Sequence, residues 1–383
     1  MDIQLDALLK FPHVTVESCA QQDNEVYLKL RFLNEEARCL RCEKLSSELH
    51  QNRPILIRDL SIFGQVTYLK IPRRQFYCHD CQGYFTESLT FMDAGRQYTR
   101  RYEEHLYQQV QLSSIEQVSR VERLSFDRIE GIFKHQYALK KTGWSGVKRL
   151  GIDEISKRKG HQNFATVIGN LEAGKLIEVI DSHQQEDIIE TLEQQPLEVR
   201  EQVEEVSVDM WGGFPKVIEK VFPNAVIVID RFHVMKAVNT ELNKIRRQAS
   251  IFDRGSKFLL LKNGKDLTPE EIERLELLLQ KSKRLAKAYE WKEEFRVIYE
   301  QSLTVEEGKH QIKEWLDKAQ TVYSEAITTI RNHLDGISNY FRNRTTSGAM
   351  EGINNRIKLI KRQAYGFVNF NNFRERLLAC FSN

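Results

Sequence analysis

Residues 149–160 read RLGIDEISKRKG, and the structure that this stretch adopts decides the fold of the middle of the chain. Leu150 and Ile152 alternate like the buried residues of a short strand, whereas Asp153 and Glu154 are expected to end it. A basic cluster follows directly, made of Lys157, Arg158 and Lys159. A carboxylate at the poorly solvated end of a buried strand is costly without a partner, and that partner is often a metal ion. An exposed turn aspartate is the alternative, and this stretch alone favours it.

The composition is that of a soluble globular protein with two or three domains. The chain has 383 residues, of which 41% are hydrophobic and 29% charged, so a sizeable core can be buried. No apolar run approaches the roughly 20 residues that span a bilayer, and the N-terminus, MDIQLDALLKFPHV, lacks the basic region of a secretory signal. We therefore expect a cytoplasmic protein without a membrane partner. The net charge of +3 does not by itself indicate nucleic acid, but Lys and Arg gather in 156–159 and 356–362.

Four of the six cysteines form two CxxC pairs, CLRC and CHDC. Each pair offers two thiolates from one tight turn, and in a reducing compartment two such turns are typical of a tetrahedral zinc site rather than of disulfides. The predicted ligands of this structural zinc are Cys39, Cys42, Cys78 and Cys81. They lie in a strand-rich head, residues 1–95, which resembles a zinc ribbon with a strand pair at 55–71 between the two turns. The metal is expected to hold a head with little core of its own, and Cys19 and Cys380 are expected to be buried thiols.

Residues 96–143 are predicted to form three helices. A helical stripe begins near 97, and Ser113 and Ser125 are expected to cap the second and third helices. A short helix, a tight turn and a helix with a basic end are typical of a helix-turn-helix that binds DNA. Three-helix packing without DNA is the alternative, and the pattern alone does not separate the two.

Residues 144–235 alternate strands with helices. Three strands come first, at 147–153 and in a hairpin over 163–180, and two later strands end at Asp209 and Asp230. This order predicts a mixed α/β sheet with helices on its faces, in which the first and fourth strands are neighbours. Such a sheet brings Asp153 and Asp209 together.

The rest of the chain is predicted to be helical. Residues 236–340 have no strand pattern and are expected to form an all-helical insertion, with a helix start at Thr268. Residues 341–383 supply closing helices, one of which carries Glu351 among many Lys and Arg residues. Trp291 in the insertion is expected in the core, with stacking on a flipped base as the alternative.

Three carboxylates thus converge in this interpretation: Asp153, Asp209 and Glu351. Such a set can hold two divalent cations about 4 Å apart, as in enzymes that cleave phosphodiesters, and hard oxygen ligands suit Mg²⁺. Asp230 also ends a strand, and the residues alone divide almost evenly between Asp209 and Asp230. Glu154 is expected to be a neighbour of the site rather than a ligand.

At this point the chain resembles, over nearly its full length, the DDE transposases of the ISL-three insertion-sequence family. The resemblance rests on the CxxC pairs, the helix-turn-helix and the strings GIDEISKRKG, VSVDMW, VIDRFHVMKAV, LLLKN, LTPEE, MEGINNRIKLIKRQAYGF and NFRERLL. It implies a multidomain α+β protein with an RNase H-like catalytic core interrupted by an all-helical insertion. It further implies a DDE triad of Asp153, Asp209 and Glu351 that uses Mg²⁺ or Mn²⁺ for DNA cleavage and strand transfer at terminal inverted repeats. Asp230, Arg231 and His233 become supporting residues near the site, although a buried structural histidine remains an equal alternative for His233.

The expected partner is double-stranded DNA, with the protein acting as a homodimer and associating with the nucleoid. The basic residues expected to contact DNA are Lys157, Arg158, Lys159, Arg231, His233, Arg356, Lys358, Lys361 and Arg362. Two other functions are possible on the same fold. A domesticated DNA-binding regulator would have lost a carboxylate, yet all three are present, and a structure-specific nuclease would need neither the head nor the insertion.

Overall fold

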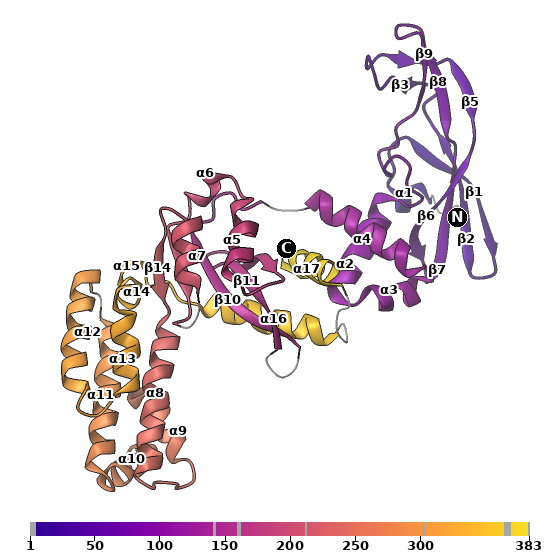
Figure 1. The fold of residues 1–383 in the computed structure, drawn as a ribbon. Helices are drawn as coiled ribbons and strands as arrows, with labels where there is room; N and C mark the ends of the chain where they lie inside the picture. Colours follow the sequence, from indigo (N-terminus) through magenta and orange to yellow (C-terminus); the bar gives the residue numbers. More distant parts are fainter. Residues whose placement is uncertain are drawn as a thin grey trace. The chain divides into compact units, whose positions relative to one another are not determined.

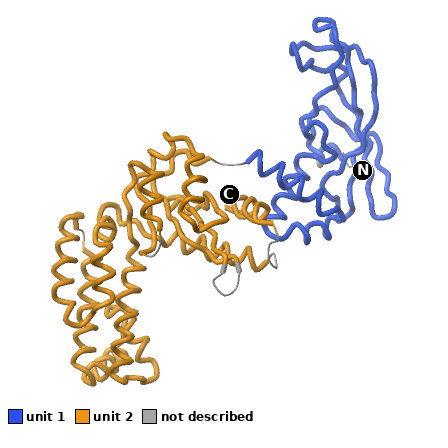
Figure 2. Tube along the Cα trace, in the orientation of Figure 1, with its two compact units in different colours: residues 1–141 blue, residues 142–383 orange. Residues whose placement is uncertain are grey.

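The structure is a computed structural model that describes residues 5–140, 143–158, 162–210, 213–301, 303–363 and 369–381. The chain divides into two compact units, residues 1–141 and residues 142–383 (Figure 2). None of the described helices is long and apolar enough to cross a membrane.

The first unit begins with a four-stranded sheet in the order β1-β2-β7-β6 (Figure 1). Its strands are β1 (Val14–Gln22), β2 (Glu25–Phe32), β6 (Ile55–Ile62) and β7 (Gln65–Ile71), and a short helix, α1 (Asp6–Leu9), precedes them. The predicted strand pair over 55–71 is confirmed as the hairpin β6–β7. Alternate residues of β2 enter an apolar core, where Leu28, Ile57 and Leu69 are at most 1% exposed. The head therefore has a core of its own, contrary to the expectation from sequence, and Cys19 on β1 is exposed rather than buried.

A smaller lobe of the same unit carries both CxxC turns. It consists of the pair β3 (Ala37–Arg38) and β4 (Leu45–Ser46) and of the three-stranded sheet β5 (Leu49–Asn52), β8 (Arg74–Cys78) and β9 (Gly83–Thr86). Its apolar cluster consists of Ala37, Phe76, Phe85 and the cysteines themselves. So few apolar side chains stabilise the lobe weakly, and a further cross-link is needed.

The predicted three helices are present as α2 (Arg100–Leu112), α3 (Ile115–Glu122) and α4 (Phe126–Lys140). The N-cap of α3 is Ser114, whose hydroxyl accepts from the Gln117 amide, whereas Ser113 is the C-cap of α2. The prediction was wrong by one residue because both positions are serine and either can cap a helix. Ser125 accepts from the Arg128 amide at 3.4 Å, as expected for the cap of α4.

A buried ion pair joins the four-stranded sheet to these helices. Arg58 of β6 donates to the Glu122 carbonyl at 2.8 Å and to its carboxylate at 3.0 Å, and the Tyr102 hydroxyl donates to the same carboxylate at 2.7 Å. Because Arg58 is only 5% exposed, breaking this contact would strand a buried charge. The sheet and the three helices therefore behave as one unit.

The second unit contains a five-stranded sheet in the order β12-β11-β10-β13-β14. Its strands are β10 (Arg149–Arg158), β11 (Gln162–Asn170), β12 (Lys175–Ile180), β13 (Glu205–Val208) and β14 (Val226–Ile229). The first three are antiparallel, whereas β10, β13 and β14 are parallel, so the predicted first and fourth strands are indeed neighbours. The expected stop at Asp153 was wrong. The strand continues to Arg158 because β11 still pairs with it after its other partner, β13, has ended at Val208.

Helices cover both faces of this sheet. The helices α5 (Gln185–Glu193) and α7 (Phe214–Val221) pack on the face that contains Leu150 and Ile152, and α6 (Leu197–Arg200) follows Pro196. The opposite face is covered by α16 (Gly348–Gln363) and α17 (Phe370–Phe381). A Cβ at Gly151 would lie 2.3 Å from the Met350 side chain, so this glycine permits the close approach of α16 to β10.

The chain between β14 and α16 is helical, as predicted. The described residues from 231 to 343 contain no strand; their α-helices are α8 (Arg231–Gln248), α9 (Ser256–Leu261), α10 (Pro269–Gln280), α11 (Lys283–Glu300), α12 (Val305–Ala319), α13 (Glu325–Asn332), α14 (Leu334–Ser338) and α15 (Tyr340–Asn343). Thr268 starts α10 with a full capping box to Glu271, in agreement with the prediction. Trp291 is 9% exposed and packs in the core, which leaves little of its ring available for stacking on a base.

Lys292 on α11 is a buried cation within this helical part. Its side chain is fully buried, and its ammonium group donates to the Leu260 carbonyl at 3.0 Å and the Lys262 carbonyl at 2.9 Å, while Glu293 pairs with its charge. Burial lowers its pKa, and Glu293 opposes that shift. The lysine thus satisfies two free carbonyls at the end of α9.

Replacing this lysine tests that role. Lys292→Met should lower the free energy of unfolding by about 3 kcal/mol, since two buried carbonyls and one carboxylate lose their partner. Lys287→Met on the same helix is the control, because Lys287 is 47% exposed and its ammonium group contacts, among the described residues, only the exposed Glu290 and the face of the Trp291 ring. Urea unfolding followed by circular dichroism measures both, and equal effects would contradict the capping role.

Candidate metal and catalytic sites

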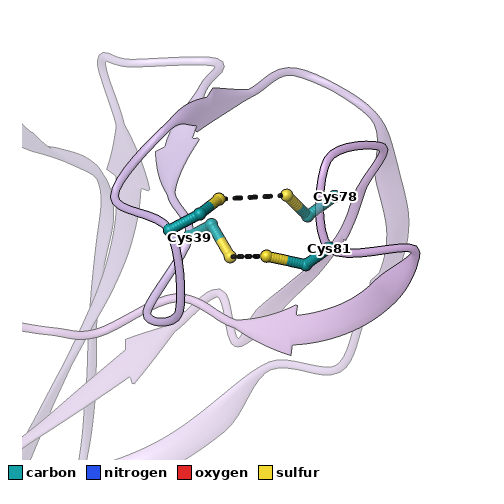
Figure 3. Close-up of side chains that lie close together, drawn as sticks. Cys39, Cys78 and Cys81 are labelled. Carbon is teal, nitrogen blue, oxygen red and sulfur yellow. Dashed lines mark hydrogen bonds between the residues drawn. The ribbon is translucent and has the colours of Figure 1, made fainter.

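The four cysteines of the small lobe lie together at the ends of its strands. The Sγ atoms of Cys42 and Cys78 are 3.6 Å apart and those of Cys39 and Cys81 are 3.9 Å apart (Figure 3). All four sulfurs lie within 4.8 Å of one another. A tetrahedral zinc with Zn–S bonds of about 2.3 Å has sulfur–sulfur edges of about 3.8 Å, so both distances fit a closed Cys₄ shell.

The thiols also need a cation on electrostatic grounds. The backbone amides of Arg41 and Cys42 lower the pKa of the Cys39 thiol to about 7. The neighbouring Cys42 thiol and burial raise the pKa of Cys81 to about 12. Four thiolates cannot coexist at neutral pH unless a divalent ion compensates their charge.

The parallel strands of the second unit set three aspartates level with one another. Gly151 pairs with Ser207, and Val208 pairs with Ile229. Continued in the same register, these pairings align Asp153 with Asp209 and Asp209 with Asp230. Asp153 shares its sheet face with Gly151, two residues earlier, and hence faces α16. A single edge of the sheet therefore gathers three carboxylates from three adjacent strands.

Asp153 is held by two donors. Its Oδ1 accepts from the Glu154 amide at 2.8 Å, and its Oδ2 accepts from Nδ2 of Asn354 on α16 at 2.6 Å. Burial raises the pKa of Asp153, and these two hydrogen bonds oppose the shift. Burial likewise raises the pKa of Glu154, for which no ligand role was expected. Asp153 is thus a partly desolvated carboxylate, for which a cation is a favourable partner.

Asp209 pairs with His233 on the first turn of α8. The His233 Nδ1 and Asp209 Oδ1 atoms are 3.1 Å apart. Burial alone would raise the pKa of Asp209, but the hydrogen bond and charge of His233 outweigh it and the pKa is lowered. Burial would lower the pKa of His233, but Asp209, helped by Asp230 and Asp153, raises it. The contact with Asp209 therefore favours the protonated form of His233 at this edge of the sheet.

The Asp230 carboxylate has a structural role. It is 3% exposed, caps α8 through the Phe232 amide, and accepts from both the amide and the hydroxyl of Ser347, the residue before α16. Asp209, by contrast, has a side chain that is 35% exposed. This difference favours Asp209 over Asp230 as a ligand, a choice that the sequence pattern alone left open.

Glu351 lies exposed on α16, one turn before Asn354. Among the described residues, the carboxylates of Asp153, Asp209 and Glu351 do not form a cluster within 4.8 Å. The structure therefore brings Asp153 and Asp209 together with His233 and adds Asn354, which the sequence interpretation missed. The available signal was its spacing, because residues three apart share one face of a helix.

Some of the basic residues predicted to bind DNA already have protein partners, whereas others are exposed. Lys157 pairs with Asp181, Arg231 with Glu300 at 3.5 Å, and His233 with Asp209. Arg356 donates to the Cys380 carbonyl and Lys361 to the Ser156 carbonyl, so both hold α16 in place. Lys358 and Arg362 are exposed on the same helix. Lys159 and the side chain of Arg158 lie outside the described residues.

A third group of possible metal ligands, Asp93, Glu103 and His135, lies in the first unit. Arg100 donates to Asp93 at 2.7 Å and Arg96 donates to Glu103 at 2.7 Å. The two guanidinium groups already balance the two carboxylates, so this cluster is an ion-pair network rather than a cation site.

Comparisons with known proteins agree with this arrangement. Residues 35–81 match the model for the zinc finger of transposases IS204, IS1001, IS1096 and IS1165, and residues 87–137 match the helix-turn-helix domain of transposase family ISL3. The chain is 27% identical, over 91% of both proteins, to the transposase for insertion sequence element IS1001 of Bordetella parapertussis. It is 26% identical, over 58% of both, to the transposase for insertion sequence element IS1557 of Mycobacterium tuberculosis. Residues 150–377 match the ISL3 transposase model, and this range contains the aligned aspartates, all of α16 and most of α17. The match covers more than half of the chain, and the protein therefore belongs to this transposase family.

Proposed function

We propose that this transposase cuts and joins DNA strands with a DDE triad of Asp153, Asp209 and Glu351. The observation that carries the proposal is the shared register of β10 and β13, which aligns Asp153 and Asp209 on adjacent strands. The helix that bears Glu351 packs against β10 through Met350. The Glu351 side chain is exposed and can turn towards the edge of the sheet when the site binds its ligands.

The residues at this edge fit divalent cations. Carboxylate and amide oxygens are the hard ligands that Mg²⁺ or Mn²⁺ prefers, and the buried amide oxygen of Asn354 has no hydrogen-bond partner among the described residues. Two such ions, when bound, activate the attacking oxygen and stabilise the leaving oxygen of a phosphodiester. Within the protein, Asn354 orients Asp153, and His233 orients Asp209 and offsets part of the negative charge.

The fold supports an RNase H-like assignment for the catalytic core. Three antiparallel strands are followed by two parallel ones, and α8–α15 separate the last strand from the helix that carries Glu351. We propose a functional division into a head (1–95), a DNA-reading part (96–143), two catalytic segments (144–235 and 341–383) and a helical insertion (236–340). The helix α8 crosses the boundary at 236, so the insertion is continuous with the last strand of the core.

The first unit is proposed to read the transposon ends. The sheet, the zinc lobe and the helices α2–α4 form one unit, so a helix that enters the major groove is held on a rigid support. Recognition of terminal inverted repeats in double-stranded DNA by two such units, one at each end, requires a homodimer.

Substitution of the triad tests the chemistry. Asp153→Asn, Asp209→Asn and Glu351→Gln should each reduce Mg²⁺-dependent cleavage and strand transfer by at least about 100-fold, because a lost ligand removes several kcal/mol of charge stabilisation. End binding by the zinc-loaded protein should persist in buffer without added Mg²⁺ or Mn²⁺. If a triad variant retains near wild-type cleavage, the substituted residue is not a metal ligand. If the wild-type protein binds the ends without cleaving them, it is a DNA-binding regulator and not an active transposase. Asp230→Asn is the control, with a lower melting temperature and a smaller loss of activity.

The zinc lobe is tested with the double variant Cys78→Ser and Cys81→Ser. Zinc content should fall from one ion per chain to none, and hydrogen exchange should rise in 37–52 and 74–86, while the four-stranded sheet stays protected by its own core. Specific end binding should be lost, while nicking of non-specific DNA with Mn²⁺ survives. Cys19→Ser, at an exposed position outside the lobe, should change none of these quantities. Unchanged specificity in the double variant would show that the lobe does not help to read the ends.

The contribution of α16 to DNA binding is tested through salt dependence. If Lys358 and Arg362 each neutralise one phosphate, replacing either by Ala should reduce the slope of log K against log salt by about 0.9. Arg356→Ala should instead lower stability with little change in slope, because its guanidinium already bonds the Cys380 carbonyl and lies over the Phe381 ring. Equal slopes in all variants would mean that this face of α16 is only solvated.

A further inference from the structure

Asn354 is a half-satisfied buried amide in the second unit. Its side chain donates through Nδ2 to Asp153 Oδ2 at 2.6 Å, and the residue is 8% exposed. Its Oδ1 has no hydrogen-bond partner among the described residues. An unpaired buried oxygen costs about 1–3 kcal/mol, so the amide is costly here unless its partner is not a protein group.

The chemistry of the amide limits what that partner can be. A carboxylate only accepts, so Nδ2 must face Asp153 and Oδ1 must point elsewhere. An amide oxygen accepts hydrogen bonds or binds hard cations. A DNA phosphate offers neither a proton nor a positive charge and does not qualify. A divalent cation or a water molecule bound to one satisfies the requirement.

The backbone position of Asn354 is rigid. Its neighbour Ile353 and residue Ile357 one turn later are at most 2% exposed and pack on the sheet. A Cβ at Gly169 of β11 would lie 2.7 Å from Ile353, so the helix is in close contact with the strand beside β10. Asn354 is therefore fixed next to Asp153, whereas Glu351, one turn earlier on the same face, is exposed. A rigid ligand or positioning group is more selective than a mobile one.

We propose that Asn354 is a fourth member of the divalent-ion site. It positions Asp153 through Nδ2 and presents Oδ1 to the ion at Asp153 or to the water on that ion. This inference rests on the proposed function, in that it takes Asp153 to be a ligand. The polar amide is then retained for metal binding at the expense of apo-protein stability.

The variant Asn354→Leu separates a metal role from a structural one, because leucine has nearly the same size but no polar atoms. Mn²⁺ is titrated into zinc-loaded, full-length protein without DNA, and free Mn²⁺ is read by electron paramagnetic resonance. The Kd for Mn²⁺ should rise at least about 10-fold. The melting temperature of the zinc-loaded protein without added Mn²⁺ should change little, because removal of the unpaired buried oxygen offsets the loss of the Nδ2 hydrogen bond to Asp153. A lower melting temperature with an unchanged Kd would mean that Asn354 is only structural, and the proposal would fail.

Two further variants complete the test. Asn355→Leu makes the same chemical change at the next, exposed position and should leave the Kd for Mn²⁺ unchanged. Asn354→Ala, which cannot overpack the site, should weaken Mn²⁺ binding as Asn354→Leu does, and it replaces the latter if that variant does not fold. An unchanged Kd in Asn354→Ala overturns the proposal.

Asp153→Asn in the same titration distinguishes the inference from the function on which it rests. Loss of Mn²⁺ binding in both the Asp153 and Asn354 variants supports both. Loss in Asp153→Asn alone overturns the role of Asn354 and leaves the triad intact. Retention of binding in Asp153→Asn means that the ion is not held at Asp153, and the proposed triad and this inference fail together.

Discussion

The common register of β10, β13 and β14 is the constraint on which the second unit depends. Neighbouring strands are about 4.8 Å apart, so this register crowds Asp153, Asp209 and Asp230 at one edge of the sheet. Three like charges at that spacing repel one another and need partners. The partners come from elements that begin or pass there: His233 from α8, Asn354 from α16, and Ser347 from the segment before α16. The entry to the helical insertion and the closing helix are consequently tied to the same edge as the aspartates.

The three aspartates have the same chemistry but different environments. The Asp230 carboxylate accepts hydrogen bonds from Phe232 at the start of α8 and from Ser347 just before α16. It therefore connects the two helix starts and has a structural role. Asp209 shares its charge with a histidine and is partly exposed, and Asp153 is desolvated and held by an amide. A cation can bind Asp209 or Asp153 without disrupting a helix cap. To bind Asp230, it would have to displace the amide that this residue caps in α8. Local hydrogen bonding therefore separates a structural carboxylate from two available ones.

The first unit uses two different means of stabilisation. The four-stranded sheet has a continuous apolar core, and the buried pair of Arg58 and Glu122 fastens the helices to it. The small lobe has few buried apolar groups and relies on four sulfurs whose spacing suits zinc. Loss of metal should hence open the lobe and spare the sheet. The core of the four-stranded sheet is thus independent of the metal.

The sequence by itself determined what depends on neighbouring residues: the CxxC turns, the period of strands and helices, the capping box at Thr268, and the carboxylates that follow β13 and β14. Such features are local, because side-chain direction repeats every two or 3.6 residues. Tertiary structure alone decided how far β10 extends, which basic side chains are already paired, and which aspartate is a helix cap. It also supplied Asn354, which lies 201 positions from Asp153 along the chain. Pairings between distant segments fix these outcomes, and no short window of sequence contains both partners.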